Sequence, residues 1–196
     1  GIPSAFQYSL FAFANLFVQS SVNSFDHVLV EGNSAAANAD PLVYDMMAAF
    51  YTACSSFIAQ NFGARKKKRI LQTYLICLFY SFITSLVLGV GIYLARYPFL
   101  YLFTSDKAVV EAGITRLSIM ALSYSASAFM DASIAASRGL GKTAVPTFVV
   151  VMGSCVFRII WIYTIFAYFH TIQSLYILYV FSWGITAIAE NIYFFH

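Results

Sequence analysis

Charged residues are scarce in this sequence. Only 10% of its 196 residues are Asp, Glu, Lys or Arg, whereas 61% are hydrophobic. A soluble domain carries about 25% charged residues, so this composition cannot provide a water-facing surface for a chain of this length. The scarcity excludes a disordered chain and an ordinary soluble enzyme, and it favours a helical membrane protein.

Cysteines and catalytic motifs are equally sparse. Cys54, Cys77 and Cys155 lie in apolar stretches at spacings that match no metal motif, so we interpret them as small packing residues. The sequence contains no H-E-x-x-H, no G-x-S-x-G and no phosphate-binding loop of the P-loop type. We therefore expect no catalytic residue, no metal site and no cofactor, and we do not expect an enzyme.

Long apolar segments are what the sequence does contain. A membrane-crossing helix needs about 20 mainly apolar residues, and Pro98 and the turn from Gly139 to Pro146 separate some of the segments. The sequence predicts an all-α membrane protein, a six-helix lobe. The predicted spans are 3–23, 42–62 (with an alternative start near 30 and a bend at Pro41), 70–95, 112–136, 144–168 and 174–195.

The basic residues predict how the spans are oriented. Seven of them fall in the loops after the second and fourth spans, namely Arg65, Lys66, Lys67, Lys68, Arg69, Arg138 and Lys142. The opposite side has two, Arg96 and Lys107, beside the acidic Asp26, Glu31, Asp40 and Asp106. Basic loops stay in the cytoplasm, so we expect a multi-pass protein of the cell (inner) membrane with both ends cytoplasmic. Between two spans, this basic run indicates contact with membrane lipid rather than nucleic acid.

Amide side chains form a row along the first predicted span. Asn15, Gln19 and Asn23 are four residues apart, and Gln7 begins the same polar pattern. Residues at this spacing share one face of a helix. Polar groups inside a membrane usually face protein or water, so the row either lines an aqueous cavity or joins helices by hydrogen bonds.

The fourth and fifth spans carry further polar residues. Ser127 and Asp131 repeat the spacing of four, with Tyr124 on the same span, and Arg158 lies in the middle of the fifth. A buried carboxylate must pair, take a proton, bind a cation or reach water. An arginine stays charged, so Arg158 needs a carboxylate, several carbonyls or a wet cavity. Asp131 is one candidate partner, and for both residues a structural role and a functional one remain open.

Aromatic residues make up 18% of the chain. Phe50 and Tyr51 are central to a cluster of aromatic and methionine residues in the second span. Such a wall suits flat apolar ligands and cation–π contacts. The alternative is that these side chains face lipid or form an interfacial belt.

Several short motifs together resemble the multidrug and toxic compound extrusion (MATE) family of secondary transporters. The segments that carry the likeness are residues 1–5 with Gln7, the turn Gln60, Asn61, Gly63 and Ala64, residues 102–104 with Asp106, the run Arg138, Gly139, Gly141 and Pro146 followed by Arg158, and residues 182–183. Their order and spacing extend over nearly the whole chain. The resemblance implies that the chain is the C-terminal lobe of a twelve-helix transporter with two six-helix lobes.

The resemblance also implies a function and partners. It implies antiport of bulky, often cationic organic compounds against a proton or sodium gradient, with access alternating between the two sides. The coupling ion, H⁺ or Na⁺, stays unassigned, because some members carry a glutamate in the first helix of this lobe and no acid lies near residues 11–15 here. We expect a partner, either an N-terminal lobe or a second copy. The opening Gly1 in place of Met suggests a fragment.

Two other functions compete with export. A flippase for a lipid-linked precursor, from the same superfamily, would need a strongly basic central cavity for pyrophosphate. A membrane scaffold that transports nothing would have a dry, fully packed interior, without the amide row of the first span facing a cavity. The charge and hydration of the interior therefore separate the three hypotheses.

Overall fold

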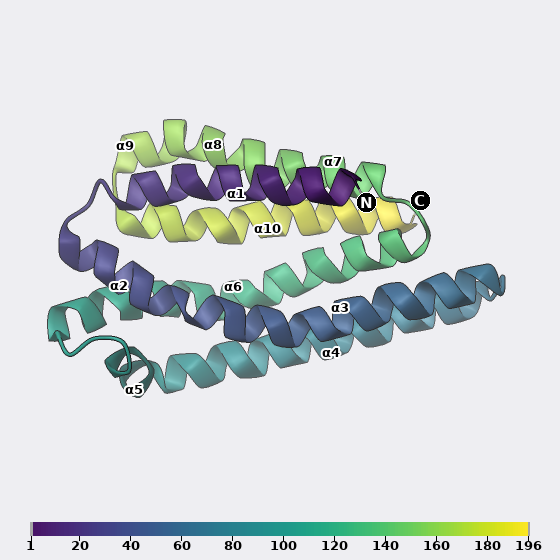
Figure 1. Cartoon of the computed structure of the whole chain (residues 1–196), viewed down its shortest axis with the longest axis horizontal. Helices are drawn as coiled ribbons and strands as arrows, with labels where there is room; N and C mark the ends of the chain where they lie inside the picture. The colour runs from purple at the N-terminus through teal and green to yellow at the C-terminus, as the bar shows by residue number, and fades with distance from the viewer. Residues whose placement is uncertain (1, 196) are drawn as a thin grey trace.

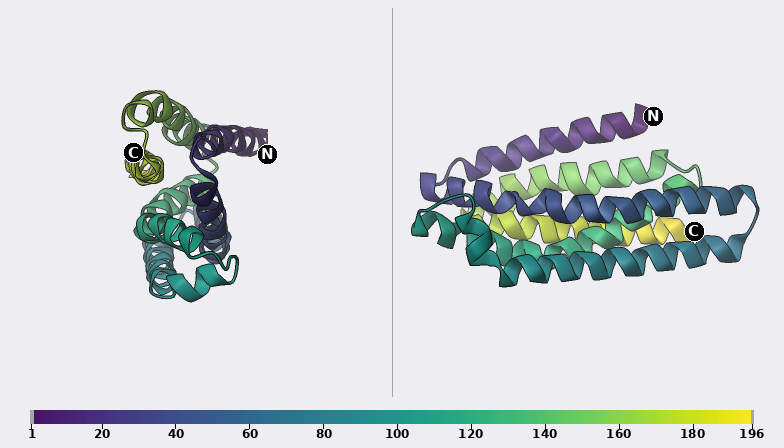
Figure 2. Two further views of the ribbon diagram at one scale, coloured as in Figure 1. Left: turned by 90° about the vertical axis from the view of Figure 1, so that its left-hand side faces the viewer. Right: turned by 60° about the horizontal axis from the view of Figure 1, so that its bottom comes forward.

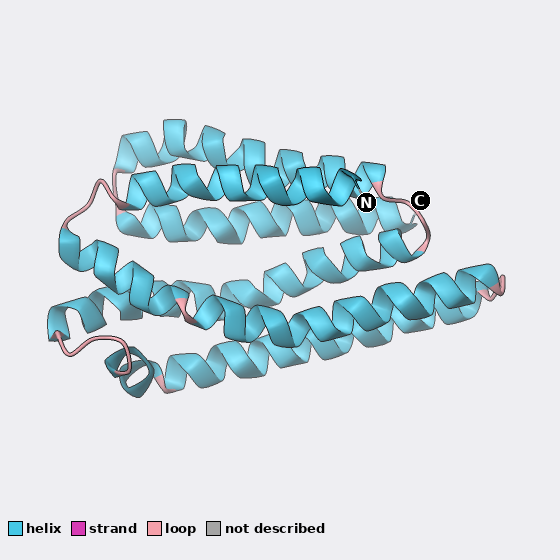
Figure 3. Cartoon of the chain, in the orientation of Figure 1, coloured by secondary structure: helices cyan, strands magenta, loops and turns pink. Residues whose placement is uncertain are grey.

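The computed structural model describes residues 2–195, without the side chains of residues 2–4, 7 and 8. This part of the chain is helical with short connecting loops and contains no strand (Figure 3). The long helices run roughly parallel to one axis (Figure 1). The all-α architecture predicted from the sequence is thus what the structure contains.

Helices cover each segment in which the sequence predicts a span. They are α1 (Ile2–Val22), α2 (His27–Ala37), α3 (Ala39–Gly63), α4 (Lys67–Leu94), α5 (Arg96–Tyr101), α6 (Lys107–Gly139), the continuous series α7 (Ala144–Val150), η1 (Val151–Val156), α8 (Phe157–Trp161), η2 (Ile162–Phe166) and α9 (Ala167–Phe169), and α10 (Ile172–Phe195). Within the described residues, five stretches are long and apolar enough to cross a membrane, and α1 adds the apolar stretch Ser9–Val22.

The helix break in the second predicted span lies at Asn38, between α2 and α3, rather than at Pro41. Proline has no N–H and its ring clashes with the carbonyl four residues earlier. Pro41 therefore disrupts the helical turn that precedes it, and the break lies in that turn. The Asn38 side chain donates to the carbonyls of Ser34 and Ala35, both at 3.1 Å. These bonds cap the end of α2.

Helix α4 ends before the proline that the sequence analysis took as its boundary. It stops at Leu94, and Pro98 lies in the first turn of the separate short helix α5, where the missing N–H costs no hydrogen bond. Aspartate side chains cap the N-termini of α2 and α6, the two helices that follow polar loops. Asp26 accepts a hydrogen bond from the Leu29 N–H (3.0 Å), and Asp106 accepts one from the Ala108 N–H (2.8 Å).

The fifth predicted span contains two π-helical segments, η1 and η2, which the sequence pattern does not predict. They flank the single α-helical stretch Phe157–Trp161 that carries Arg158. A π turn is wider than an α turn and often marks a functional position. Here the two segments lie on either side of the helical stretch that carries Arg158.

The helices form two groups, which are seen along the long axis in Figure 2 (left). One group contains α1, α7–α9 and α10, and its core includes Val18, Trp161 and Leu175. The other contains α3, α4 and α6, and its core includes Met47, Tyr74 and Met120. Helix α6 packs against α2, α3, α4 and α10, so it is the element that joins the two groups.

The two basic turns have different local geometry. At the α3–α4 turn the residue with positive φ is Arg65 (56°), not Gly63, around which a Cβ would meet nothing within 4 Å. At the α6–α7 turn Gly141 has a φ of 78°, the left-handed region that favours glycine. The reason for a glycine at position 139 is steric, since a Cβ there would lie 2.7 Å from the Ser55 carbonyl oxygen on α3.

Candidate functional site

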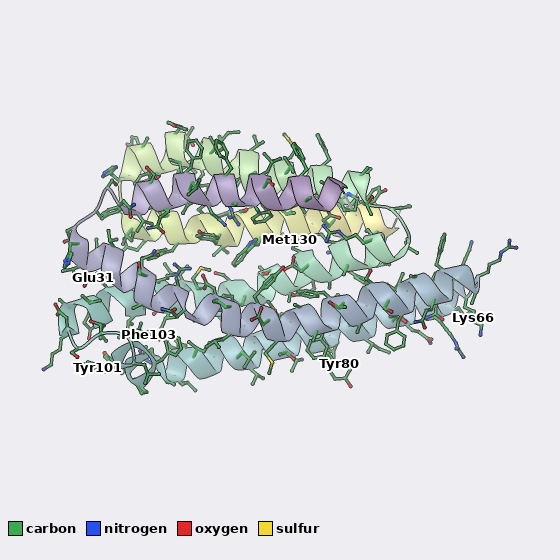
Figure 4. The ribbon with its side chains drawn as sticks, in the orientation of Figure 1. Glu31, Lys66, Tyr80, Tyr101, Phe103 and Met130 are labelled. Carbon is green, nitrogen blue, oxygen red and sulfur yellow. The ribbon has the colours of Figure 1, made fainter. Side chains whose placement is uncertain are left out.

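A cavity of about 610 Å³ lies where the two helix groups meet. Sites for small organic molecules are concave and occupy about 300–1,000 Å³. The lining side chains come from α1, α3, α6, α7, α8 and α10. They are Phe11, Ala12, Asn15, Asp40, Pro41, Tyr44, Asp45, Met47, Met120, Tyr124, Ser127, Met130, Asp131, Ile134, Arg138, Val150, Arg158, Tyr179 and Trp183. Met130, labelled in Figure 4, marks the α6 wall.

Asp131 lines this cavity from α6, one turn after Ser127. The Ser127 hydroxyl donates to one Asp131 carboxylate oxygen at 3.0 Å. Two residues four apart lie on one face of a helix, and here that spacing brings the two side chains into a direct hydrogen bond. Because Asp131 lines the cavity, its carboxylate borders the space that a ligand or ion would occupy.

The Arg158 side chain, on α8, contacts α1 and α10. It is 1% exposed and donates from Nη1 to the Asn15 side-chain oxygen (2.9 Å) and from Nε to the Ser182 hydroxyl (3.3 Å). Its guanidinium also lies over the rings of Phe11 (5.2 Å) and Tyr179 (4.7 Å). Its partners are thus an amide, a hydroxyl and two aromatic faces rather than Asp131, which answers the pairing question that the sequence left open.

A second polar network includes a residue that the sequence analysis did not single out. Arg116, on α6, donates from Nη2 to one Asp40 carboxylate oxygen (2.5 Å) and from Nη1 to the Asn33 side-chain oxygen (2.8 Å). The Tyr124 hydroxyl donates to the other Asp40 oxygen at 2.6 Å. Asp40 was expected in a loop, but it lies in the first turn of α3 and is only partly exposed. A buried arginine in a predicted span always needs such a partner, and that signal could have identified Arg116.

The structure brings only some of the predicted site residues together. Asn15, Tyr124, Ser127, Asp131 and Arg158 line the cavity. Gln19 lines a second, smaller cavity of about 380 Å³. Its side-chain amide donates a hydrogen bond to the Asn23 side-chain oxygen (2.9 Å). The Gln7 side chain lies outside the described residues.

Three predicted positions are outside both cavities. Asn23 is exposed after the end of α1, because the helix stops at Val22. Phe50 stacks on Tyr80 of α4 with ring centroids 6.2 Å apart. The Tyr51 hydroxyl donates to the Met47 sulfur (3.3 Å) within the α3–α4–α6 core. The residues that reach the cavity from α3 are Tyr44, Asp45 and Met47, which precede Phe50 and Tyr51 along the helix.

The predicted signature residues lie at the two turns at one end of the molecule. Gln60 and Asn61 close the last turn of α3, where the Ala64 N–H donates to the Gln60 carbonyl (3.0 Å) and the Asn61 amide donates to the Phe57 carbonyl (2.8 Å). Pro146 is buried near the start of α7. Arg138 differs from the rest of this set, because it also lines the cavity.

The charges of the cavity wall are mixed, and one of its carboxylates, Asp40, is paired with Arg116. Asp40, Asp45 and Asp131 contribute carboxylates, and Arg138 and Arg158 contribute guanidinium groups. Between them lie methionine and aromatic side chains, which adapt to flat apolar molecules. This wall suits an organic molecule with an apolar body and a charged group.

Comparison with known proteins connects this geometry with a family. The family model MatE matches residues 3–164. Two solved structures of the MATE transporter VcmN from Vibrio cholerae, a point mutant and the bent form, match with TM-scores of 0.88 and 0.87 at 19% identity. A MOP superfamily transporter from Pyrococcus furiosus, described as having a binding pocket of reverse polarity, matches with a TM-score of 0.72 at 20% identity. No curated protein matches the sequence.

The matches cover unequal shares of the two chains compared. Each structural match covers 98% of this chain but only 44%, 44% and 42% of the solved chains, in the same order. The chain thus spans less than half the length of the transporters whose fold it shares. On the match to its family model and on this fold, the chain belongs to the MatE family and has the architecture of one lobe of a MATE transporter.

Proposed function

We propose that this chain forms half of a secondary active exporter of small organic, mainly cationic compounds. The observation that supports the proposal is the cavity of about 610 Å³, which has three carboxylates and an aromatic and methionine wall at the meeting of two helix groups. A second lobe, or a second copy of the chain, would close this cavity from the other side. Rocking of the two lobes about it would alternate access.

An ion gradient would drive the cycle. A membrane potential of 100 mV supplies about 2.3 kcal/mol per charge moved, which corresponds to a roughly fiftyfold concentration ratio. The counter-transported ion would be a proton or Na⁺, and Asp131 is the carboxylate we assign to it. Its position supports this assignment, since it lines the cavity and accepts one hydrogen bond, from Ser127.

The membrane and its sides are part of the proposal. We place the chain in the cell (inner) membrane with both ends cytoplasmic. Both termini and both basic turns lie at the same end of the helices in Figure 1, and Lys66 marks the tip of the α3–α4 hairpin at that end in Figure 4. Glu31 and Phe103 lie at the opposite end. Basic residues favour the cytoplasmic side.

The two competing functions fit the cavity less well. A flippase for a pyrophosphate-linked lipid would need an excess of basic side chains, whereas the wall of this cavity has three carboxylates against two arginines. A scaffold would need no polar cavity, whereas Asn15 of the amide row lines both cavities. Export is therefore the function that we propose.

An efflux assay with Asp131→Asn tests the proposal. In cells lacking their own exporters, we expect the wild-type protein to expel a cationic dye in a manner that depends on a proton or sodium gradient. We expect Asp131→Asn to lower the efflux rate about tenfold or more, because an amide at this position cannot bind and release a proton or Na⁺ as a carboxylate does. The measurement is dye fluorescence over time, with the amount of folded protein in the membrane determined by size-exclusion chromatography.

The matched control is Glu111→Gln. Glu111 is exposed on the same helix, α6, and is absent from the lining of either cavity, so this variant should expel the dye at the wild-type rate. Equal efflux by Asp131→Asn and the wild-type protein would remove Asp131 from the mechanism. Absence of efflux and ion dependence for every cationic dye tried would count against the exporter.

A further inference from the structure

Glu190, near the end of α10, is a buried acid that lines neither cavity. It is 0% exposed, and it is absent from the lining of both cavities. It shares one face of α10 with Ala187, which packs in a core cluster with Ile134 of α6 and Val150 of α7. The Glu190 carboxyl group is therefore enclosed by the helices of the lobe itself, rather than placed in the space that a substrate would fill.

Both oxygens of the Glu190 carboxyl group are buried, and neither has a hydrogen-bond partner within the described chain. The polar side chains beside it on α10 donate elsewhere. The Thr186 hydroxyl donates to the Ser182 carbonyl (2.7 Å), and the Asn191 amide donates to the Ala187 carbonyl (2.8 Å). Because the lobe itself encloses the two oxygens, a second lobe or a substrate cannot reach them in this conformation.

An ionised carboxylate would be unstable in this setting. Burial removes water from the charge, and among the described residues no N–H or O–H group replaces that water. A carboxylate that is buried without hydrogen bonds takes up a proton instead. A proton is also small enough to bind to oxygens that have no accessible surface. The geometry therefore favours a neutral, protonated Glu190.

The charged groups around Glu190 belong mainly to the end of α6 and the turn that follows it. The Arg138 guanidinium, on α6, acts electrostatically on the Glu190 carboxyl group. The Lys142 ammonium group lies 5.1 Å from the centroid of the Tyr193 ring, about one turn further along α10. Helix α7 contributes no charged or titratable residue. Further charged or titratable side chains on the elements that contact α10 are Arg158, Cys155, Tyr74 and Asp131.

Arg138 connects Glu190 with the larger cavity. It lines that cavity together with Asp131, which lies two turns earlier on α6, and its charge acts on the Asp131 carboxyl group as well. One guanidinium thus interacts with two carboxyl groups, one beside the cavity and one buried. When a proton or a bound cation neutralises Asp131, the charge of Arg138 is balanced less, and the ionised form of Glu190 becomes more favourable.

We propose that Glu190 is a second proton-binding group of the lobe, which holds a proton in this conformation and releases it to water when Asp131 takes up a cation or a proton. The proposal rests on the proposed function, because the released proton would leave in exchange for a cationic substrate. The end of α10 and the α6–α7 turn lie at the same end of the molecule in Figure 1. The proposed orientation assigns this end to the cytoplasm, so the proton would leave on that side.

Infrared spectroscopy of the purified full chain, without substrate, tests whether Glu190 is protonated. A protonated carboxyl group has a C=O stretching band that an ionised carboxylate lacks. At about pH 6, above the usual range of carboxyl groups in water, Glu190→Gln should lose the share of this band that one carboxyl group contributes. The control is Glu111→Gln, which removes a glutamate that is exposed on α6 and should leave the band unchanged. A band of equal area in Glu190→Gln and in the wild-type protein would overturn the proposal.

The pH dependence of the same band tests the link through Arg138. Because Asp131→Asn removes a negative charge that balances Arg138, the midpoint at which Glu190 loses its proton should fall by about one pH unit. The control is Asp45→Asn, which removes another aspartate of the larger cavity and should leave the midpoint unchanged. A midpoint that Asp131→Asn does not move would remove the link, and with it the release of the proton. Glu190→Met, with an apolar side chain of similar length, replaces Glu190→Gln if the amide variant does not fold.

These spectra need no substrate, so they separate the proton site from the exporter. Efflux of a cationic dye by a protein in which Glu190 contributes nothing to the band would reject the proton site and leave the proposed exporter intact. A protonated Glu190 whose midpoint responds to Asp131→Asn, in a protein that expels no dye, would retain the linked proton site and reject the exporter.

Discussion

Arg158 is the side chain around which the larger cavity is organised. It is almost completely buried, yet its partners are neutral: Asn15, Ser182 and two aromatic rings. Neutral partners solvate a guanidinium without cancelling its charge. The cavity therefore keeps a positive charge on the α8 wall that faces carboxylates on the α3 and α6 walls, and an organic molecule lying between them meets both signs.

The Asp40–Arg116 ion pair permits a prediction at the residue scale. A double-mutant cycle with Asp40→Asn and Arg116→Met should give a coupling energy of about 0.5–3 kcal/mol, because the two side chains share a hydrogen bond in a partly buried setting. The measurement is the free energy of unfolding in mixed micelles. The control cycle combines Asp40→Asn with Lys142→Gln, in the turn that follows α6, where we expect less than about 0.5 kcal/mol. Equal coupling in the two cycles would contradict the pair's contribution.

The sequence indicated some of these residues and missed others for a physical reason. Asn15, Asp131 and Arg158 could be predicted as cavity-lining because a polar group in an apolar helix must face protein or water. Arg116 was missed because it lies near the start of its predicted span, and Asp40 because it was expected in a loop, and in both places a charge can reach water. Phe50 and Tyr51 were wrongly placed, because aromatic side chains suit a cavity, a core and lipid alike.

At the scale of helices, small residues allow close packing between neighbouring backbones. A Cβ on Gly32 of α2 would lie 2.6 Å from the Ala112 Cβ and 2.8 Å from the Gly113 nitrogen on α6. Similar approaches pair Gly139 with α3 and Gly153 with Thr186 of α10. Small residues at interfaces are the usual means of packing helices in a membrane. Here they hold α6 against α2 and α3, and η1 against α10.

Gly32→Ala tests this close approach. The added methyl group must displace backbone atoms, so we expect a loss of about 1–3 kcal/mol in the free energy of unfolding. In the matched control, Gly91→Ala, the methyl group meets nothing within 4 Å, and alanine's higher helix propensity should leave stability unchanged or raise it by up to about 1 kcal/mol. Thermal unfolding in detergent measures both. A Gly32→Ala variant as stable as Gly91→Ala would show that α2 and α6 can separate freely.

Helix positions were easier to predict from the sequence than helix irregularities. Long apolar runs locate helices, since a span has a minimum length. The break at Asn38 and the π segments on either side of Arg158 depend on packing and local hydrogen bonds, which a run of apolar residues does not encode. The local geometry around Arg158 is therefore a property of the folded lobe rather than of its own segment.

At the scale of the whole molecule, the proposed orientation can be measured by labelling single cysteines. With the three native cysteines replaced, Lys66→Cys should react with a membrane-impermeant maleimide only after the cells are permeabilised. Phe103→Cys, at the opposite end (Figure 4), should react in intact cells. The reverse pattern would invert the topology, and labelling of both variants in intact cells would reject a membrane-spanning hairpin. The native cysteines are buried and unbonded, so replacing them should perturb the surface little.

The central position of α6 has a consequence for how the protein is made. Among the candidate spans of the described chain, α6 is both the least apolar and the most buried, and it carries Arg116 and Asp131. A helix of this kind gains little from entering lipid alone. It would need the α3–α4 hairpin already in the bilayer as a protein surface to settle against. We therefore expect biosynthesis to proceed in a fixed order, in which α6 leaves the translocon only after the α3–α4 hairpin has entered the bilayer.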